Sequence, residues 1–148
     1  MTDKYFMDLA NLEGKKALKR GDYPCGCIVV KKGKLISKSS SQGITKNDVT
    51  AHAEIIAIRK ACKKLKSRFL DNCVLYTNIE PCLMCGKAIV YSRIKRIVYG
   101  ANHMEYNNKK TFDILKRNGI GKNIKIIKGL EKNIANMLLK EFLKMNRK

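Results

Sequence analysis

The chain has 148 residues, of which 45% are apolar, so its size is that of one domain and its composition excludes a disordered chain. No apolar run reaches the roughly 18 residues of a membrane helix and the polar N-terminus does not resemble a secretory signal, so we expect a cytoplasmic single domain over residues 1–148 without membrane contact. The net charge of +20 admits a nucleic-acid partner, although its excess of lysine over arginine is also what a genome-wide coding bias would produce.

The first predicted elements are a helix and a β-hairpin. Apolar residues near helical spacing predict a helix over Asp3–Arg20, which the Gly-Asp-Tyr-Pro stretch at residues 21–24 ends. Two short runs, Cys25–Val30 and Leu35–Lys38, flank a Lys-Gly turn and predict two antiparallel strands.

A loop, a second helix and a third strand follow. Residues Ser37–Asp48 are polar and predict a loop, after which Thr50 is a candidate N-cap. The helix predicted over residues 51–65 is apolar almost all round at its start, which indicates burial. The run Cys73–Thr77 is typical of a strand in a sheet that is covered on both faces.

The rest of the chain alternates helices and strands. The predicted helices cover Pro81–Tyr91, Thr111–Asn118 and an amphipathic segment from Leu130 to Met145, and the predicted strands cover Arg96–Tyr99 and Ile124–Ile127. This alternation predicts an α/β fold with right-handed crossovers and helices on both faces of the sheet.

Two short segments at predicted helix starts contain the residues that indicate chemistry. One carries His52 and Glu54, and the other carries Cys82 and Cys85. The two cysteines are three residues apart and share a helix face, and a helix N-terminus stabilises the thiolate form that zinc binds. With His52 they make a three-ligand set, which leaves the fourth position of a catalytic zinc for water. Glu54 is a candidate general acid and base that transfers protons at such a site.

A closed, structural zinc site is the alternative interpretation. In a reducing compartment the cysteines are expected to be thiols or metal ligands. A fourth ligand would have to come from Cys25, Cys27, Cys62 or Cys73. We favour the catalytic interpretation because Glu54 lies two residues after His52 in an otherwise apolar stretch, and a structural site has no use for it.

The pattern His-x-Glu followed by Pro-Cys-x-x-Cys is the signature of zinc deaminases of nucleobases. On this pattern the chain resembles the cytidine-deaminase-like superfamily over nearly its whole length, with its matching text at residues 47–55, 75–85 and 91–100. The guanine deaminases, fungal-type cytosine deaminases and bacterial tRNA adenosine deaminases are the most similar in appearance. The resemblance implies a three-layer α/β/α sandwich around a five-stranded mixed sheet in the order 2-1-3-4-5, with strands 4 and 5 parallel, and it implies a homodimer.

The resemblance also implies hydrolytic deamination with Zn2+ as the cofactor. His52, Cys82 and Cys85 would hold the metal. Glu54 would take a proton from water, deliver it to the ring nitrogen and then protonate the departing amine.

Substrate contacts are predicted from the resemblance alone. The three similar families place an asparagine eleven residues before the histidine ligand to hold the base, and here that position is Ser41, which cannot offer both groups of an amide. Cys25 falls where a pocket wall is expected, although ordinary burial in a strand is the plainer explanation. The other candidates adjoin a ligand or follow the fourth predicted strand: Ala51, His103, Tyr106, Phe112 and Asp113.

Three functions compete on the sequence alone. The first is a deaminase of a free nucleobase or nucleoside in purine salvage or a related route, with guanine slightly favoured over cytosine. The second is a tRNA adenosine deaminase that flips its base out and contacts phosphates with lysines. The third is a non-catalytic, zinc-bearing module that binds nucleic acid, which predicts a fourth protein ligand and no role for Glu54.

Overall fold

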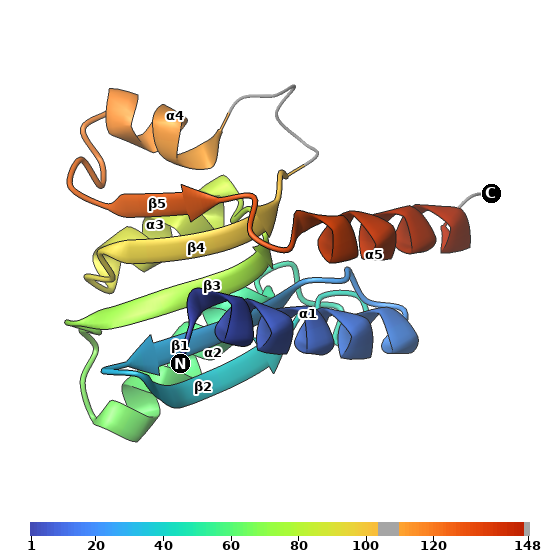
Figure 1. The fold of residues 1–148 in the computed structure, drawn as a ribbon, viewed down its shortest axis with the longest axis horizontal. Coiled ribbons are helices and arrows are strands. Elements are labelled where there is room, and N and C mark those ends of the chain that lie inside the picture. Colours follow the sequence, from blue (N-terminus) through green and yellow to red (C-terminus); the bar gives the residue numbers. More distant parts are fainter. Residues whose placement is uncertain (104–109, 147–148) are drawn as a thin grey trace.

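The computed structural model describes residues 1–103 and 110–146, and Figure 1 shows their arrangement. The helices are α1 (Asp3–Arg20), α2 (Ala53–Leu65), α3 (Leu83–Tyr91), α4 (Thr111–Arg117) and α5 (Lys132–Met145). The strands are β1 (Gly26–Lys31), β2 (Lys34–Ser40), β3 (Cys73–Ile79), β4 (Arg96–Ala101) and β5 (Lys125–Lys128). In this described part of the chain, no helix combines the length and the apolar character needed to cross a membrane.

The strands form one mixed sheet in the order β2-β1-β3-β4-β5. β1 pairs antiparallel with β2 and with β3, whereas β3, β4 and β5 run parallel. α1 and α5 lie side by side on one face, α2 and α3 cover the other, and α4 packs against α3 (Figure 1). This confirms the predicted three-layer fold, the strand order and the parallel pairing of the last two strands.

The interior strand β1, between β2 and β3, supplies residues to both layers of the core. Successive residues of a strand point to opposite faces, so Ile28 and Val30 pack with the apolar side of α1, whereas Cys27 and Val29 pack with the alanines of α2. A strand that is buried on both faces is apolar throughout, which is why β1 shows no polar alternation.

The start of β1 approaches α1 closely. A Cβ on Gly26 would lie 2.0 Å from the carbonyl oxygen of Ala10, so only glycine fits there. The side chain of Asn78 on β3 donates to the Pro24 carbonyl at 2.9 Å and accepts from the Gly26 N–H at 2.8 Å. These contacts hold the backbone on both sides of Cys25, the residue that precedes β1.

The second strand is longer than the sequence predicts. The polar residues that predict a loop from Ser37 onward continue β2 as far as Ser40, which pairs with Gly26 of β1. The hydroxyls of Ser37 and Ser39 donate to the carbonyls of Ala57 and Ala53 in α2. A buried strand tolerates these serines because α2 satisfies their hydroxyls.

Candidate active site

His52 and Cys82 occupy equivalent places at the starts of two helices. Each is an N-cap residue with an extended backbone, His52 for α2 and Cys82 for α3. This corrects two sequence-based boundaries, because Thr50 and Pro81 lie ahead of these caps. Thr50 does not cap the helix, since its N–H and hydroxyl both donate to Asp48 Oδ1, at 2.9 and 2.7 Å.

The side chains of His52, Cys82 and Cys85 converge on one point. Their ligand atoms all lie within 4.8 Å of one another, and His52 Nδ1 is 3.6 Å from Cys82 Sγ and 3.4 Å from Cys85 Sγ. Tetrahedral ligands of zinc, with bonds of about 2.3 Å to sulfur and about 2.0 Å to nitrogen, are separated by about 3.6 Å. The donor set and its spacing therefore fit zinc, with Nδ1 as the ligand atom of His52.

The thiols of the two cysteines in this cluster have pKa values shifted in opposite directions. The hydrogen bond from the Cys85 side chain, helped by His52, lowers the pKa of Cys82 to about 4. The same bond and the burial of the thiol raise the pKa of Cys85. Because zinc binds the thiolate form, a pair that readily releases one proton at neutral pH is a suitable ligand pair.

The remaining cysteines lie outside the cluster. Within residues 1–103 and 110–146, no further histidine, cysteine or carboxylate joins the three ligands. Cys25, Cys27, Cys62 and Cys73 are free thiols. In the described part of the chain the cluster therefore has the three protein ligands of a catalytic zinc site rather than the four of a structural site.

Glu54 lies in the first turn of α2 and is 3% exposed. Burial raises the pKa of its carboxyl group, because a low-dielectric environment disfavours the charged form. A carboxyl group with a raised pKa exchanges protons more effectively near neutral pH. The thiol of Cys25 donates to Glu54 Oε1 at 3.5 Å.

A cavity of about 290 Å³ opens beside Glu54 and the metal ligands, which suits a small, flat ligand. Its walls come from the segment before β1, the loop after β2, the start of α2 and the ends of β3 and β4. The lining residues are Tyr23, Cys25, Ser41, Gly43, Ile44, Asp48, Val49, His52, Ala53, Glu54, Ile79, Glu80, Cys82 and His103.

The structure brings some of the sequence-predicted contacts to this cavity. Cys25, Ser41 and His103 line it. Ala51 is buried behind it, where its carbonyl accepts from the Gln42 N–H at 2.9 Å.

Two further candidates line a smaller, separate cavity with Tyr99. They are Phe112, which is buried against Gly86 of α3, and the exposed Asp113. Tyr106 lies outside the described residues.

Glu80 has a role that sequence reasoning did not assign. Its carboxylate is buried and accepts from the backbone N–H groups of His103 and Thr111, at 3.0 and 2.9 Å. The hydroxyl of Thr111 in turn donates to the Pro81 carbonyl. Glu80 thereby ties the end of β4 and the start of α4 to the metal-binding segment. The signal in the sequence is an acidic residue placed directly before Pro-Cys.

Asp22 anchors the loop that forms one wall of the cavity. Its buried carboxylate accepts from the N–H groups of Ile44 and Thr45, from the Thr45 hydroxyl and from Arg20. Burial raises the pKa of Asp22, but the hydrogen bonds from Thr45 and Arg20 outweigh it and hold that pKa below its ordinary value. The loop therefore depends on a charged carboxylate.

The chain matches the model of a known family over residues 1–101, the cytidine and deoxycytidylate deaminase zinc-binding region. It is 38% identical to a tRNA-specific adenosine deaminase of Buchnera aphidicola (subsp. Schizaphis graminum), over 98% of the chain and 96% of that relative. It is also 49% identical to a guanine deaminase of Bacillus subtilis, over 55% of the chain and 53% of that relative.

A solved structure shares this fold. It comes from work on A-to-I editing by tRNA deaminases at the wobble position of transfer RNA. The TM-score is 0.84 at 34% identity, over 91% of the chain and 99% of that structure. The zinc-ligand cluster and the two kinds of deaminase relative together agree with a zinc-dependent deaminase.

Proposed function

Because the chain belongs to the cytidine and deoxycytidylate deaminase zinc-binding family and is a zinc-type deaminase, we propose that it converts adenosine to inosine in transfer RNA. Two relatives that match almost the whole chain in sequence, at 38% and 39% identity, are named tRNA-specific adenosine deaminases, whereas the guanine deaminase of Bacillus subtilis matches about half of it. This reverses the order suggested by the sequence alone, which placed guanine first. Residues 1–148 would act as one catalytic domain.

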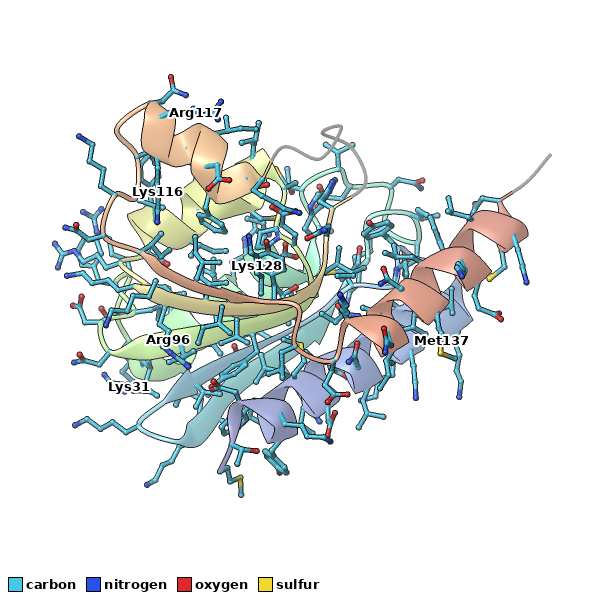
Figure 2. All side chains as sticks on the ribbon, turned by 45° about the horizontal axis from the view of Figure 1, so that its top comes forward. Lys31, Arg96, Lys116, Arg117, Lys128 and Met137 are labelled. Atoms are coloured by element: carbon cyan, nitrogen blue, oxygen red, sulfur yellow. The ribbon has the colours of Figure 1, made fainter. Side chains whose placement is uncertain are left out.

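A basic groove beside α5 is the observation that carries this proposal. It has a volume of about 940 Å³, and its lining includes Lys110, Lys128, Lys132 and Lys140, with asparagines at 102, 133 and 136. No acidic residue is among the described residues that line it. Figure 2 labels Lys128 of β5 and Met137 of α5, which line two sides of the groove.

The groove and the small cavity beside Glu54 have neighbouring lining residues after β4. Asn102 lines the groove, and the next residue, His103, lines the cavity. A free base fills only a small cavity, and it has no phosphate groups for the lysines of the groove to contact. An RNA strand, by contrast, needs cationic side chains along its phosphates and a pocket for one flipped base.

The residues of the cavity suit the chemistry of deamination. His52, Cys82 and Cys85 would hold zinc, which supplies an activated water near neutral pH when it is bound. Glu54 would accept a proton from the attacking water and deliver it to the ring nitrogen beside the carbon under attack. It would then take the remaining proton of the added hydroxyl group and pass it to the amino group, so that the carbonyl forms, water is consumed and ammonia leaves.

Guanine deamination is the second candidate, supported by the B. subtilis relative and by the position of His103 in the cavity wall. The two candidates differ in how they respond to salt. Turnover of an RNA held through its phosphates falls steeply as salt rises, whereas turnover of a free base hardly changes.

The test is a substrate panel assayed with the zinc-loaded protein. It contains an anticodon stem-loop with adenosine at the wobble position, the same stem-loop with guanosine there, and free guanine, cytosine, adenine and their nucleosides. We expect inosine and ammonia from the first substrate at low salt, and little from the rest. Faster ammonia release from guanine than from the adenosine stem-loop would overturn the assignment.

A homodimer and a cytoplasmic location complete the proposal. The face formed by α2 and α3 exposes apolar side chains, including Met84 and Tyr91, around a shallow hollow lined by Ile58 and Phe69. Such a patch is typical of a surface that another protein covers. Light scattering on the purified protein should give the mass of two chains.

A further inference from the structure

We infer that Cys25 is a positioning residue whose thiol holds the carboxylate of Glu54 in its working orientation. This inference rests on the proposed role of Glu54 as the proton carrier. It gives Cys25 a task different from that of a pocket wall or of a simple core residue.

The first support is the rigidity of the backbone around Cys25. Asn78 holds the peptide groups on both sides, and the carbonyl of Cys25 itself accepts from the Ser41 N–H at 3.0 Å. Gly26 allows the closest approach of this segment to α1. The thiol is therefore carried on a backbone that has little freedom to move.

The second support is the direction of the hydrogen bonds at the thiol. Thr77 Oγ1 is 3.0 Å from the carbonyl of Ile79, which can only accept, so the hydroxyl of Thr77 donates there. Thr77 Oγ1 is also 3.4 Å from Cys25 Sγ and presents a lone pair to it. The thiol is therefore the donor in this cluster, and of the two acceptors that its single proton can reach, Thr77 Oγ1 and Glu54 Oε1, the ionised carboxylate is the stronger.

The third support is that Glu54 has few other partners. Within the described part of the chain, Cys25 is the side chain that donates a hydrogen bond to its carboxylate. Cys25 is 5% exposed, and this burial raises the pKa of its thiol and keeps the proton in place at neutral pH. A protonated, immobile donor can fix the angle of a carboxylate that must point at the substrate.

The test compares three substitutions of Cys25 in the zinc-loaded protein, with the adenosine stem-loop as substrate. C25V keeps the volume of the side chain but removes its hydrogen-bond donor. C25A removes both the volume and the donor, and C25S keeps a donor. We expect kcat to fall about three- to tenfold in C25V and C25A, the size of one hydrogen bond from a weak thiol donor, while KM changes less than twofold. C25S should stay within twofold of the wild type.

Cys27 provides the matched control, because it is also buried and lies two residues further along the chain, on β1, but makes no hydrogen bond to Glu54. C27A should keep the wild-type kcat even if it unfolds at a lower temperature. A wild-type kcat in C25V would overturn the inference, and so would a change confined to KM, which is what a pocket wall would produce.

Two further measurements separate this inference from the proposed function. Adding C25V to E54Q should produce no additional loss of kcat if Cys25 acts through Glu54. An E54Q variant with full activity would overturn the role of Glu54 itself, whereas an inactive E54Q beside a fully active C25V would overturn only the role of Cys25.

A spectroscopic readout needs no substrate. The S–H stretching band that disappears in C25V belongs to Cys25, and it should shift when its acceptor is removed in E54A. An identical band in E54A and the wild type would show that the thiol does not donate to Glu54.

Discussion

The two faces of the sheet differ in what they enclose and what they leave open. Beneath α2 and α3 lie the metal ligands and Glu54, most of them buried and fixed by two helix starts. On the side of α5 lies a wide groove bordered by lysines, of which Lys128, Lys132 and Lys140 are exposed (Figure 2). We therefore propose that deamination takes place in the small cavity beside the buried ligands, and we expect the open, charged face to select the substrate.

The largest expected effect tests the enclosed side. E54Q removes the proton carrier but keeps the shape of the side chain, so we expect kcat to fall about 10²- to 10⁴-fold. Zinc content should stay at the wild-type level because Glu54 is not among the three clustered ligands. Full activity in E54Q with zinc retained would show that another group moves the proton.

A smaller effect is expected at the loop that encloses the cavity. D22N removes the charge that accepts four hydrogen bonds in a buried site, which should destabilise the protein by about 2 kcal/mol at pH 7. The pKa of Asp22 is lowered in the folded state, so this stabilisation is present above the unfolded pKa and is lost as pH falls through the folded one. Urea unfolding at pH 7 and at acid pH measures the difference in unfolding free energy between the wild type and D22N. This difference should disappear at acid pH.

The open side is tested by reversing charge in the groove. The double variant K128E/K132E should raise KM for the adenosine stem-loop about tenfold and flatten its dependence on salt, because fewer phosphate contacts release fewer counterions. Turnover of any free nucleoside should not change. K34E/K64E, with two exposed lysines outside the groove lining, is the matched control. An equal rise in KM for the stem-loop in both double variants would mean that RNA binding depends only on the net charge of the protein and not on the groove.

The smallest expected effect is a change in stability at the ion pair that joins α1 to β4, on the face of the sheet that carries α5. Arg96 pairs with Asp3 at 2.7 Å, Tyr76 donates to Asp3, and the bond from Arg96 lowers the pKa of Asp3. Because both charged partners are about one-third exposed, D3N should cost less than about 1 kcal/mol at pH 7. The difference in unfolding free energy should vanish as pH falls through the folded pKa of Asp3. A larger loss would mean that α1 depends on this pair more than on its apolar contacts.

Local patterns in the sequence predict much of this protein. The types and spacing of His52, Cys82 and Cys85 predict a zinc site, because metal binding by thiolate and imidazole depends on residue type and helix geometry. Apolar periodicity likewise placed the helices and most strands within a few residues. The sequence pattern misplaces the end of β2, because its serines predict a loop, whereas carbonyl groups of α2 accept hydrogen bonds from the hydroxyls of Ser37 and Ser39.

The sequence indicated the two metal-binding segments, the glutamate beside one of them and the alternation of helices and strands, since each is a pattern of residue types along the chain. Only the tertiary structure decided which distant segments share the cavity. It placed Cys25 against Glu54 and Glu80 against His103 and Thr111, and it separated Phe112 from the cavity wall. The reason is that such contacts join residues from different strands and loops. Their hydrogen bonds depend on sheet register and helix packing, which no local pattern specifies.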